Sequence, residues 1–384
     1  MDIGLIRATL TIFMAIYIYG CGGDGEPYYG YRIYLYNLFK TTYLWSDDVD
    51  LDIDVSDFNS PSEMVKYLKY EPIDRWSFVM TREESRELLT QNGAGFGFAY
   101  SNLDGNLTVL YVRDGSPADS ANLKRGDIVL EIDGDRATED SIRYSIGVNR
   151  EVEFKIWRGG YISTIYIEPR DYNFRVTDIK IIDGHIGYFR LDSFNVDALD
   201  EIEECFNLLK SRGVDELIVD LRYNGGGSLV MASIIMDKLT TGLDGEVQFK
   251  LRWNRRYRAR DYTYRFEEDS NSLNLNRVIF LTGRNSASAS EAVINGLKPY
   301  MEVITIGDRT YGKPVGMEGV EDREYVYYLV NFKIENSLGI SDYFDGLDVT
   351  AGCETEDDLK HPLGDVKEAL LSQALYFIKR GECR

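Results

Sequence analysis

The spacing of hydrophobic residues changes twice along the 384-residue chain. From residue 28 to about 90, apolar side chains recur every three or four positions, which predicts a small helical domain. From 91 to about 170, short runs of β-branched and aromatic residues are separated by Gly and Asp, as in a small β-rich module. From 171 to 384, buried strands alternate with helical patterns. The pattern therefore predicts a multidomain α/β protein.

Individual elements can be assigned in the helical region and in the α/β region. Ser60-Pro61 supplies a capping residue with proline just inside a helix, so we expect a helix to begin there. A second short helix is predicted over 82–89. In the α/β region we expect, in chain order, a strand from His185, a helix over 197–212, a strand over 216–221, helix 229–239, strand 277–282, helix 290–300, strand 302–306, an edge strand over 325–334, and a closing helix over 365–380.

The first residues have the form of an export signal. Residues 8–19 are almost entirely apolar, but 12 residues are too few to cross a bilayer, which takes about 20. Cys21 follows in a Gly-rich stretch, as in bacterial lipoprotein signals, where the cysteine is acylated. We therefore expect a signal peptide over 1–20, a membrane anchor on Cys21, and a tether with the helical domain over 21–90. A plain secretory signal or a buried N-terminal helix is the alternative.

Export would place the protein in a bacterial cell envelope, either in the periplasm or anchored to the outer membrane. The formal net charge is -21, and no basic stripe suited to a nucleic-acid backbone is present, which excludes nucleic acid as a partner. Cys353 and Cys383 bracket the C-terminal segment and could pair, whereas Cys205 lies in a helical pattern and is expected to be buried and free. No CxxC pair occurs and the two histidines are isolated, so we expect no metal and no cofactor.

Candidate chemistry lies in three turns that each follow a predicted strand of the α/β region. RYNGGGS, from Arg222, offers consecutive backbone N–H groups. NSASASE, from Asn285, places serines at a helix start, where free N–H groups favour an anion. Ser288 and Glu291 also fit a capping box, so Ser288 could be a cap or a nucleophile. Lys313, in RTYGKPVG, could be a solvated charge or, if partly buried, a base.

These three turns together resemble the C-terminal processing (tail-specific) serine peptidases. The matching segments are Asp220–Gly227, Ser286–Glu291 and Thr310–Lys313. The resemblance implies a crotonase/ClpP-like α/β core over 171–384, with Ser288 as nucleophile and Lys313, 25 residues later, as general base. The N–H of Ala289 and that of Gly226 or Gly227 would then hold the oxyanion.

The middle module resembles a PDZ domain, which these peptidases carry before the core. The resemblance rests on Gly95-Phe96-Gly97-Phe98 and on GSPADSANLKRGDIVLEIDG, from Gly115. It implies that the domain spans about 91–170 and that the glycine loop binds the C-terminal carboxylate of a peptide, which adds as a strand to the sheet edge. The N-terminal region resembles that of lipoprotein members of the family.

One position departs from the family pattern. Met317 stands where a glutamine that orients the lysine is common. The resemblance still implies an exported Ser-Lys endopeptidase that cleaves unfolded or C-terminally tagged polypeptides and recognises their C-termini. Met317 favours an alternative, a catalytically weak or inactive PDZ-containing lipoprotein that binds peptides. The signal and the aromatic content leave a third alternative, a carbohydrate-binding surface lipoprotein. The pattern predicts no oligomeric state.

Overall fold

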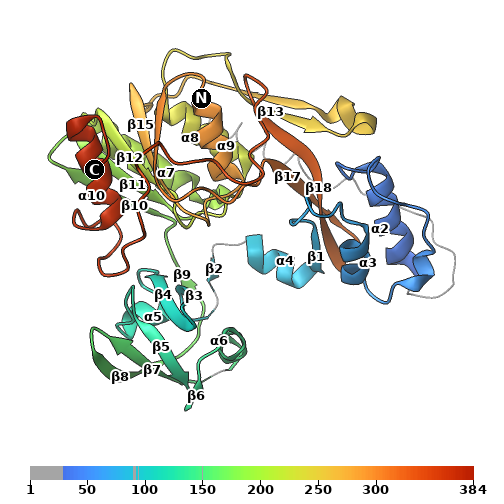
Figure 1. The fold of residues 1–384 in the computed structure, drawn as a ribbon, viewed down its shortest axis with the longest axis horizontal. Coiled ribbons are helices and arrows are strands. Elements are labelled where there is room, and N and C mark those ends of the chain that lie inside the picture. The colour runs from blue at the N-terminus through green and yellow to red at the C-terminus, as the bar shows by residue number, and fades with distance from the viewer. Residues whose placement is uncertain (1–28, 90–91, 94, 149) are drawn as a thin grey trace. The chain divides into compact units, whose positions relative to one another are not determined.

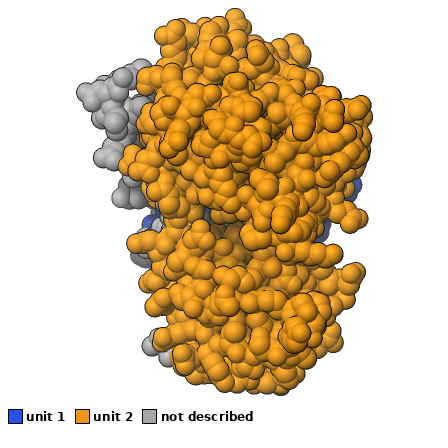
Figure 2. Space-filling model, turned by 90° about the vertical axis from the view of Figure 1, so that its left-hand side faces the viewer, with its two compact units in different colours: residues 1–88, 251–262, 315–334 blue, residues 89–250, 263–314, 335–384 orange. Residues whose placement is uncertain are grey.

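The structure, a computed structural model, describes residues 29–89, 92–93, 95–148 and 150–384 (Figure 1). The predicted signal peptide and Cys21 lie outside these residues. The chain forms two compact units, coloured separately in Figure 2. The first combines the described part of residues 1–88 with Leu251–Tyr262 and Val315–Ile334, and the second contains the remainder. In the part of the chain that is described, no helix has the length and apolar character needed to cross a membrane.

The first unit contains the predicted N-terminal helices. They are α2 (Tyr29–Thr41), α3 (Pro61–Leu68) and α4 (Arg82–Leu89), and a short 3-10 helix that was not predicted, η2 (Val55–Asp57), lies between α2 and α3. Ser60 caps α3 as expected, since its side chain accepts a hydrogen bond from the Glu63 N–H. The expected small helical domain does not account for the whole unit, because strands from distant parts of the chain also belong to it. These are β1 (Phe78–Thr81), β17 (Val315–Glu321) and β18 (Tyr325–Asn336), and η4 (Arg255–Arg260) accompanies them.

The prediction that residues 325–334 form an edge strand is also wrong. β18 pairs antiparallel with β1 and with β17, so that Tyr328 lies opposite both Phe78 and Gly319. β13 (Val247–Trp253) and β14 (Tyr262–Arg265) complete this five-stranded sheet. A polar residue of β18 is buried, since Asn331 is only 2% exposed, and it donates a hydrogen bond to the Thr42 carbonyl.

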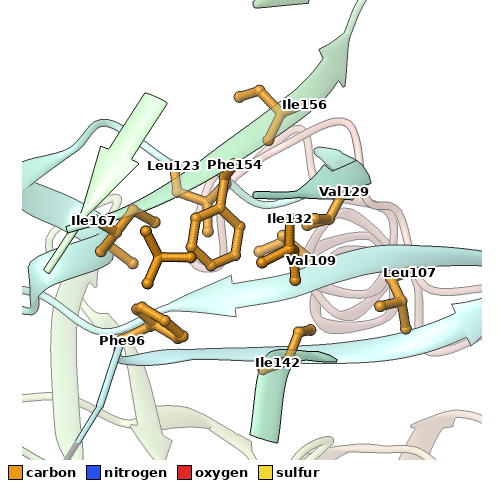
Figure 3. Packing of buried hydrophobic residues seen from close by; sticks show 12 residues of the cluster. Phe96, Leu107, Val109, Leu123, Val129, Ile132, Ile142, Phe154, Ile156 and Ile167 are labelled. Carbon is orange, nitrogen blue, oxygen red and sulfur yellow. The ribbon is translucent and has the colours of Figure 1, made fainter. Parts of the chain in front are cut away.

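The β-rich module is the predicted small domain, and its hydrophobic core is shown in Figure 3. Its sheet has the order β3-β4-β5-β7-β8, with β6 paired to β5. Its elements are β3 (Phe98–Leu103), β4 (Asn106–Val112), α5 (Pro117–Ser120), β5 (Ile128–Ile132), β6 (Asp135–Arg136), α6 (Glu139–Ile146), β7 (Val152–Arg158) and β8 (Tyr161–Ile167). Alternate residues of β7 are buried and meet Phe96 and Ile142, which closes the core between sheet and helix. β2 (Asn92–Gly93) and β9 (Tyr172–Asn173) pair where the chain enters and leaves the module.

The α/β region is built on a second sheet with the order β10-β11-β12-β15-β16. The last four strands are parallel, and β10 runs antiparallel to β11. The strands are β10 (Thr177–Ile182), β11 (Ile186–Leu191), β12 (Glu216–Asp220), β15 (Arg277–Thr282) and β16 (Glu302–Gly307). The helices are η3 (Val196–Ala198), α7 (Leu199–Ser211), α8 (Leu229–Leu239), α9 (Ala289–Leu297) and α10 (Ala369–Arg380).

Helices cover both faces of this sheet (Figure 1). α10 packs Leu370, Leu371 and Phe377 against one face. On the other face Phe189 of β11 meets Phe206 of α7 edge to face. A sheet buried on both sides explains why its strands are continuous apolar runs. Together with the other two domains, it confirms the predicted multidomain α/β class.

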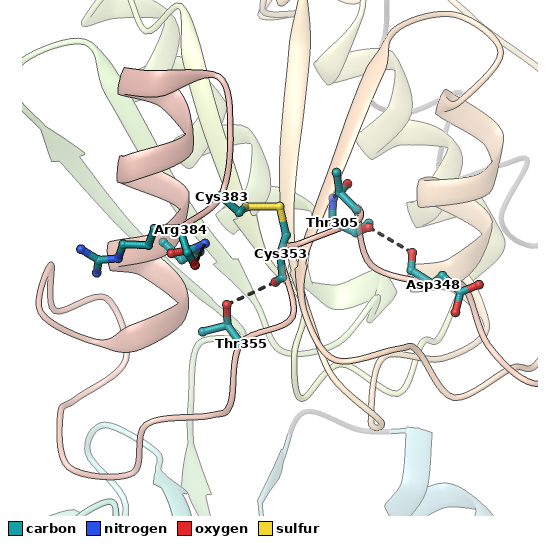
Figure 4. Close-up of a disulfide and its surroundings, with 8 residues drawn as sticks. Thr305, Asp348, Cys353, Thr355, Cys383 and Arg384 are labelled. Atoms are coloured by element: carbon teal, nitrogen blue, oxygen red, sulfur yellow. Dashed lines mark hydrogen bonds between the residues drawn. A yellow bond between two sulfur atoms is a disulfide. The ribbon is translucent and has the colours of Figure 1, made fainter.

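A disulfide joins the C-terminal tail to this region. Cys353 and Cys383, 30 residues apart, are bonded, as the spacing had suggested (Figure 4). Cys383 follows α10, and the Cys353 carbonyl accepts a hydrogen bond from the N–H of Gly307 at the end of β16. The bond therefore fastens the tail to the sheet. Cys205 is free and buried, also as expected.

Candidate active site

The three predicted turns meet at one edge of the parallel sheet. Asp220, the last residue of β12, lies opposite Leu281 of β15, and Thr282 lies opposite Gly307, the last residue of β16. Since the strands are parallel, their carboxyl ends lie side by side, and so do the segments that follow them. The Ala287 N–H donates to the Asn224 carbonyl, and the Tyr311 N–H donates to the Ser286 carbonyl. These two bonds tie the glycine turn, the serine segment and the lysine loop together.

Ser288 occupies a strained backbone conformation immediately before α9. Its φ is 58°, a region that costs a residue with a side chain about 1–2 kcal/mol. The strain is held by hydrogen bonds on both sides, because its carbonyl accepts from the Ala292 N–H and its own N–H donates to Glu291 at 2.9 Å. The side chain is half-buried at the start of a helix. A nucleophile in this position would have the helix N–H groups beside it.

Glu291 connects the serine segment to the lysine loop. It is fully buried, and its carboxylate accepts four hydrogen bonds. Oε1 accepts from the Thr310 hydroxyl at 2.6 Å and the Gly312 N–H at 2.7 Å. Oε2 accepts from the N–H groups of Ser288 at 2.9 Å and Lys313 at 2.8 Å. Burial raises the pKa of the Glu291 carboxyl, and these four bonds oppose that rise. The sequence predicted Glu291 only as part of a capping box.

The lysine loop is also braced from its other side. The Thr310 N–H donates to the Leu347 carbonyl, and the Leu347 N–H donates back to the Thr310 hydroxyl. Gly312 has a φ of 89°, and a β-carbon there would lie 2.3 Å from the Phe344 carbonyl oxygen, so only glycine fits. Lys313 itself is half-buried. Met317 lies beyond this loop on β17, in the first unit.

The glycine turn lies directly against Ser288. A β-carbon on Gly226 would approach the Ser288 β-carbon to 2.8 Å and the Ala289 nitrogen to 3.0 Å. The Gly226 N–H, however, donates to the Asn224 side chain at 2.9 Å and is not available to an oxyanion. Within the described part of the chain, the N–H groups of Gly227 and Ala289 have no protein partner. Of the residues predicted for an oxyanion hole, Gly227 and Ala289 are therefore the free donors.

The two neighbouring serines have structural roles. Ser286 and Ser290 are both 0% exposed. The Ser286 hydroxyl donates to the Leu221 carbonyl at 2.8 Å, and the Ser290 hydroxyl donates to the Asn224 carbonyl at 2.9 Å. Buried hydroxyls committed to backbone carbonyls are poor nucleophiles. The geometry therefore separates Ser288 from the other two.

A buried charge network under the glycine turn was not predicted from the sequence. Arg222, 3% exposed, binds Asp220, Glu368 and Asp357, and Glu368 is itself fully buried. Tyr188 donates to the Asp220 carboxylate at 2.8 Å. The sequence did contain a signal for this network, because an acidic and a basic residue, Asp220 and Arg222, follow each other closely at the end of an apolar strand. Buried charges are kept only when they are paired.

The same network contacts the PDZ-like module within the second unit. Arg125 of the module donates to the Tyr223 hydroxyl and to Asp357, each at 2.6 Å. Asp357 also accepts hydrogen bonds from Tyr223 and Arg222, and these residues precede Asn224, whose side chain holds the Gly226 N–H. Hydrogen bonds thus join the module to Arg222 and Tyr223, and the chain itself connects these residues to Asn224 and the glycine turn.

The glycine loop that the sequence predicts to bind a carboxylate immediately precedes β3, which is an edge strand of the module's sheet. Gly95 and Gly97 have φ of 114° and 84°, and a β-carbon on Gly97 would lie 2.2 Å from Ser116. Phe96 faces the core, so only its backbone is available to a ligand, and Phe98 is half-buried. The Arg113 N–H donates to the Gly97 carbonyl, so the backbone groups of Gly97 face β4. Backbone groups alternate in direction along an antiparallel strand, so the N–H of the next residue, Phe98, faces the open edge of β3.

Groups that could hold a metal ion are absent from the residues that the structure describes. His185 is exposed, and His361 is engaged with the Asp358 carboxylate at 2.5 Å. Among the described residues, the ring nitrogens of the two histidines bond to the Asp183 carbonyl and to Asp358 rather than to Ser288, which leaves Lys313 as the candidate base.

Replacing Glu291 by glutamine tests whether this carboxylate holds the site together. The amide NH2 would face two of the four donors, and each hydrogen bond to a charged group is worth about 1.5–3 kcal/mol. We expect the free energy of unfolding to fall by about 2–4 kcal/mol, and peptide cleavage to fall about 100-fold because Ser288 and Lys313 separate. Thermal unfolding and kcat/KM measure the two effects.

Glu216→Gln is the matched control for this variant. Glu216 binds Arg277 at the opposite, amino-terminal end of β12 and should affect cleavage little. Unchanged kcat/KM in Glu291→Gln would show that the carboxylate does not position the site.

Residues 185–328 match peptidase family S41, residues 94–168 match the PDZ domain, and residues 34–78 match the peptidase S41 N-terminal domain. A probable CtpA-like serine protease of Staphylococcus aureus is 25% identical over 264 residues, covering 66% of this chain and 50% of that protein. The chloroplastic carboxyl-terminal-processing peptidase 3 of Arabidopsis thaliana is 28% identical over 237 residues, covering 54% and 43%. The chain thus spans about half the length of these curated relatives.

Solved structures share the fold over most of the chain. A Bacteroides fragilis protein assigned to the S41 proteases superposes with a TM-score of 0.77 at 24% identity, covering 94% of this chain and 100% of that one. The photosystem II D1 C-terminal processing protease gives a TM-score of 0.57 at 16% identity, covering 89% and 96%. At these identities the likeness describes the fold.

Proposed function

We propose that the chain is an exported serine endopeptidase with a Ser288–Lys313 dyad, because its segments match peptidase family S41, the peptidase S41 N-terminal domain and the PDZ domain. One observation carries the proposal. The buried Glu291 carboxylate binds the N–H groups of both Ser288 and Lys313, so a strained serine at a helix start and a lysine loop are held together. A capping serine alone would need neither the lysine loop nor the strain.

The proposed reaction begins when Ser288 Oγ attacks the carbonyl carbon of a peptide bond. Neutral Lys313 takes the hydroxyl proton and then gives it to the leaving amine as the C–N bond breaks. The oxyanion is held by the N–H groups of Ala289 and Gly227, the two donors without a protein partner. Water then hydrolyses the acyl-enzyme, with Lys313 again as the base. No cofactor enters the reaction.

The proposed substrates are polypeptides recognised by their C-termini. The glycine loop and the outward-facing Phe98 N–H would receive a terminal carboxylate, and the peptide would extend the sheet at β3. A membrane anchor on Cys21 and a place in the bacterial cell envelope remain part of the proposal, and both rest on the sequence of residues 8–21.

Two forms of one disordered polypeptide test this recognition. Both end in an apolar residue, but one carries a free carboxylate and the other a C-terminal amide. We expect the amidated form to be cleaved about tenfold more slowly, because it offers the loop no anion. Mass spectrometry of the products over time measures both rates. Equal rates would contradict tail recognition, and no cleavage of either form would contradict the peptidase itself.

The alternative is an inactive PDZ-containing lipoprotein that binds peptides, and Met317 is the residue that favours it. A fluorophosphonate probe, which labels only an activated serine, separates the two functions. Labelling at Ser288 supports the peptidase. Binding of a peptide C-terminus without labelling or cleavage supports the alternative.

A further inference from the structure

A cavity in the second unit is lined by residues of both the PDZ-like module and the α/β region. Its volume of about 240 Å³ equals that of about eight water molecules in the liquid, at about 30 Å³ each. The module contributes the turn after β4, and the α/β region contributes β10, β11 and α7. The charged lining residues are Arg113, Arg175, Arg190, Asp114, Asp178 and Asp192.

Arg190 of β11 brings an incompletely bonded guanidinium group to this cavity. Its side chain is only 16% exposed. Nε lies 3.0 Å from the Asp192 carboxylate, but its N–H is not directed at that oxygen, and Nε has no hydrogen-bond partner among the described residues. Nη1 lies 4.0 Å from Asp178, which is too far for a hydrogen bond. Because buried donors are normally satisfied, this guanidinium has unused capacity for a ligand.

Arg113 supplies a second guanidinium group, from the module. The residue is half-buried and lies over the ring of Phe174, with 3.7 Å between its Cζ and the ring centroid. Stacking on a ring occupies the face of the guanidinium and leaves the N–H groups at its edge able to donate. The described residues give Arg113 no ion pair, whereas Arg175 pairs with Glu204 at 2.9 Å. Arg113 and Arg190 are therefore the two cations with donors to spare.

The aspartates of the cavity do not use up these donors. Asp178 and Asp192 both face Arg190, and Asp114 is exposed in the turn after Arg113. Each guanidinium carries five N–H donors, so the carboxylates beside Arg190 leave donors on both arginines. A ligand would therefore be held by directed hydrogen bonds from two guanidinium groups, and Asp114 would oppose an anion.

We propose that this cavity is a binding site for a phosphate group, held by Arg113 of the module and Arg190 of the α/β region. The guanidinium fork matches the oxygens of a phosphate. A phosphate has tetrahedral oxygens and can accept from two guanidinium groups that approach from different directions, whereas a carboxylate has two oxygens in one plane. A free phosphate ion and a small phosphate ester share this chemistry. The proposal does not depend on the proposed peptidase activity.

The site adjoins the segment that supports the glycine turn. Asp192 directly follows β11, and two residues later the Phe194 N–H donates to the Gly226 carbonyl at 3.0 Å. The Phe194 carbonyl accepts from the Ser228 N–H at 2.9 Å. A bound phosphate would therefore join the module to the segment that holds the glycine turn, as a second link beside that of Arg125.

Two adjacent substitutions with opposite expected effects test the proposal. Calorimetric titration of the full chain with sodium phosphate, at constant ionic strength, measures the affinity. Arg113→Gln removes a charged donor and should weaken phosphate binding by at least about tenfold. Asp114→Asn removes a repelling charge and should strengthen binding about twofold to fivefold. Opposite changes at neighbouring positions would not arise from a general loosening of the turn.

Arg136→Gln is the matched control. It removes the same charge from an exposed site on β6, where Arg136 donates to the Gly105 carbonyl at the turn before β4, whereas Arg113 follows the other end of that strand. Screening by salt should limit its effect on phosphate affinity to less than about twofold. Absence of phosphate binding by the wild type, or unchanged binding in Arg113→Gln, would overturn the proposal.

Two further ligands identify the chemistry of the site. Acetate, titrated at the same ionic strength, should bind at least about tenfold more weakly than phosphate, because it has only two oxygens in one plane. Acetate that binds as tightly as phosphate would also overturn the proposal. Glycerol phosphate distinguishes the two sources of the group. Tighter binding than that of inorganic phosphate assigns the site to a phosphate ester, and weaker binding assigns it to the free ion.

Discussion

Replacing Ser288 by alanine should reduce peptide cleavage by about 1000-fold or more while leaving the fold intact. Removal of a serine nucleophile leaves only the contribution of the oxyanion donors and of substrate binding. The backbone bonds that hold the site, from the Ser288 N–H to Glu291 and from the Ala292 N–H to the Ser288 carbonyl, do not involve the lost hydroxyl. Cleavage of a disordered polypeptide, with circular dichroism to verify the fold, measures the effect.

Ser290→Ala is the control for this variant, because it removes a hydroxyl two residues away in the same segment. Ser290 donates to the Asn224 carbonyl, so its loss should cost about 1 kcal/mol of stability and reduce activity less than tenfold. Cleavage by Ser288→Ala at a rate near that of the wild type would refute the assignment of the nucleophile.

Lys313→Met should have an effect of similar size. Without a base the serine hydroxyl keeps its proton and does not attack. The loop is bound to Glu291 through the backbone N–H of Lys313, so a side-chain replacement leaves this contact in place. Methionine has a similar length and an apolar stem. The variant therefore separates loss of the base from loss of loop structure. We expect its thermal unfolding to match that of the wild type.

The pH profile gives a second reading of the same prediction. A lysine acts as a base only in its neutral form, so the wild-type rate of the chemical step should rise with pH, and the residual rate of Lys313→Met should lack that rise. Lys298→Met, which removes a charge at the end of α9, should retain both the activity and the rise. A wild-type profile that is flat while chemistry limits the rate would exclude the lysine base.

The predictions that rest on local signals in the sequence were the most accurate ones. Helices α4 and α8 begin and end at the predicted residues, and Ser60 caps α3 as expected. These features depend on interactions between residues a few positions apart, which the order of residues specifies directly. The prediction of an edge strand over β18 was wrong because partners on both sides come from distant segments.

The candidate site shows the same division. The three turns converge as predicted, because parallel strands bring their carboxyl ends to one edge of the sheet. Glu291 was expected only to cap a helix, and its bonds to Gly312 and Lys313 span about twenty residues of chain. Gly226 was expected as a possible oxyanion donor, but Asn224 takes its N–H. Hydrogen-bond partners of this kind depend on which groups meet in space.

The order of residues alone thus specified the α/β class and the three chemically distinctive turns, because these follow from periodicity, strand ends and the types of side chain. The pairing of serine with lysine came from the family resemblance and stays a prediction. The tertiary structure alone decided which N–H groups remain for an oxyanion and which carboxylate joins Ser288 to Lys313. The physical reason is that a buried acceptor has few lone pairs, so the use of each donor depends on every other donor that folding brings to it.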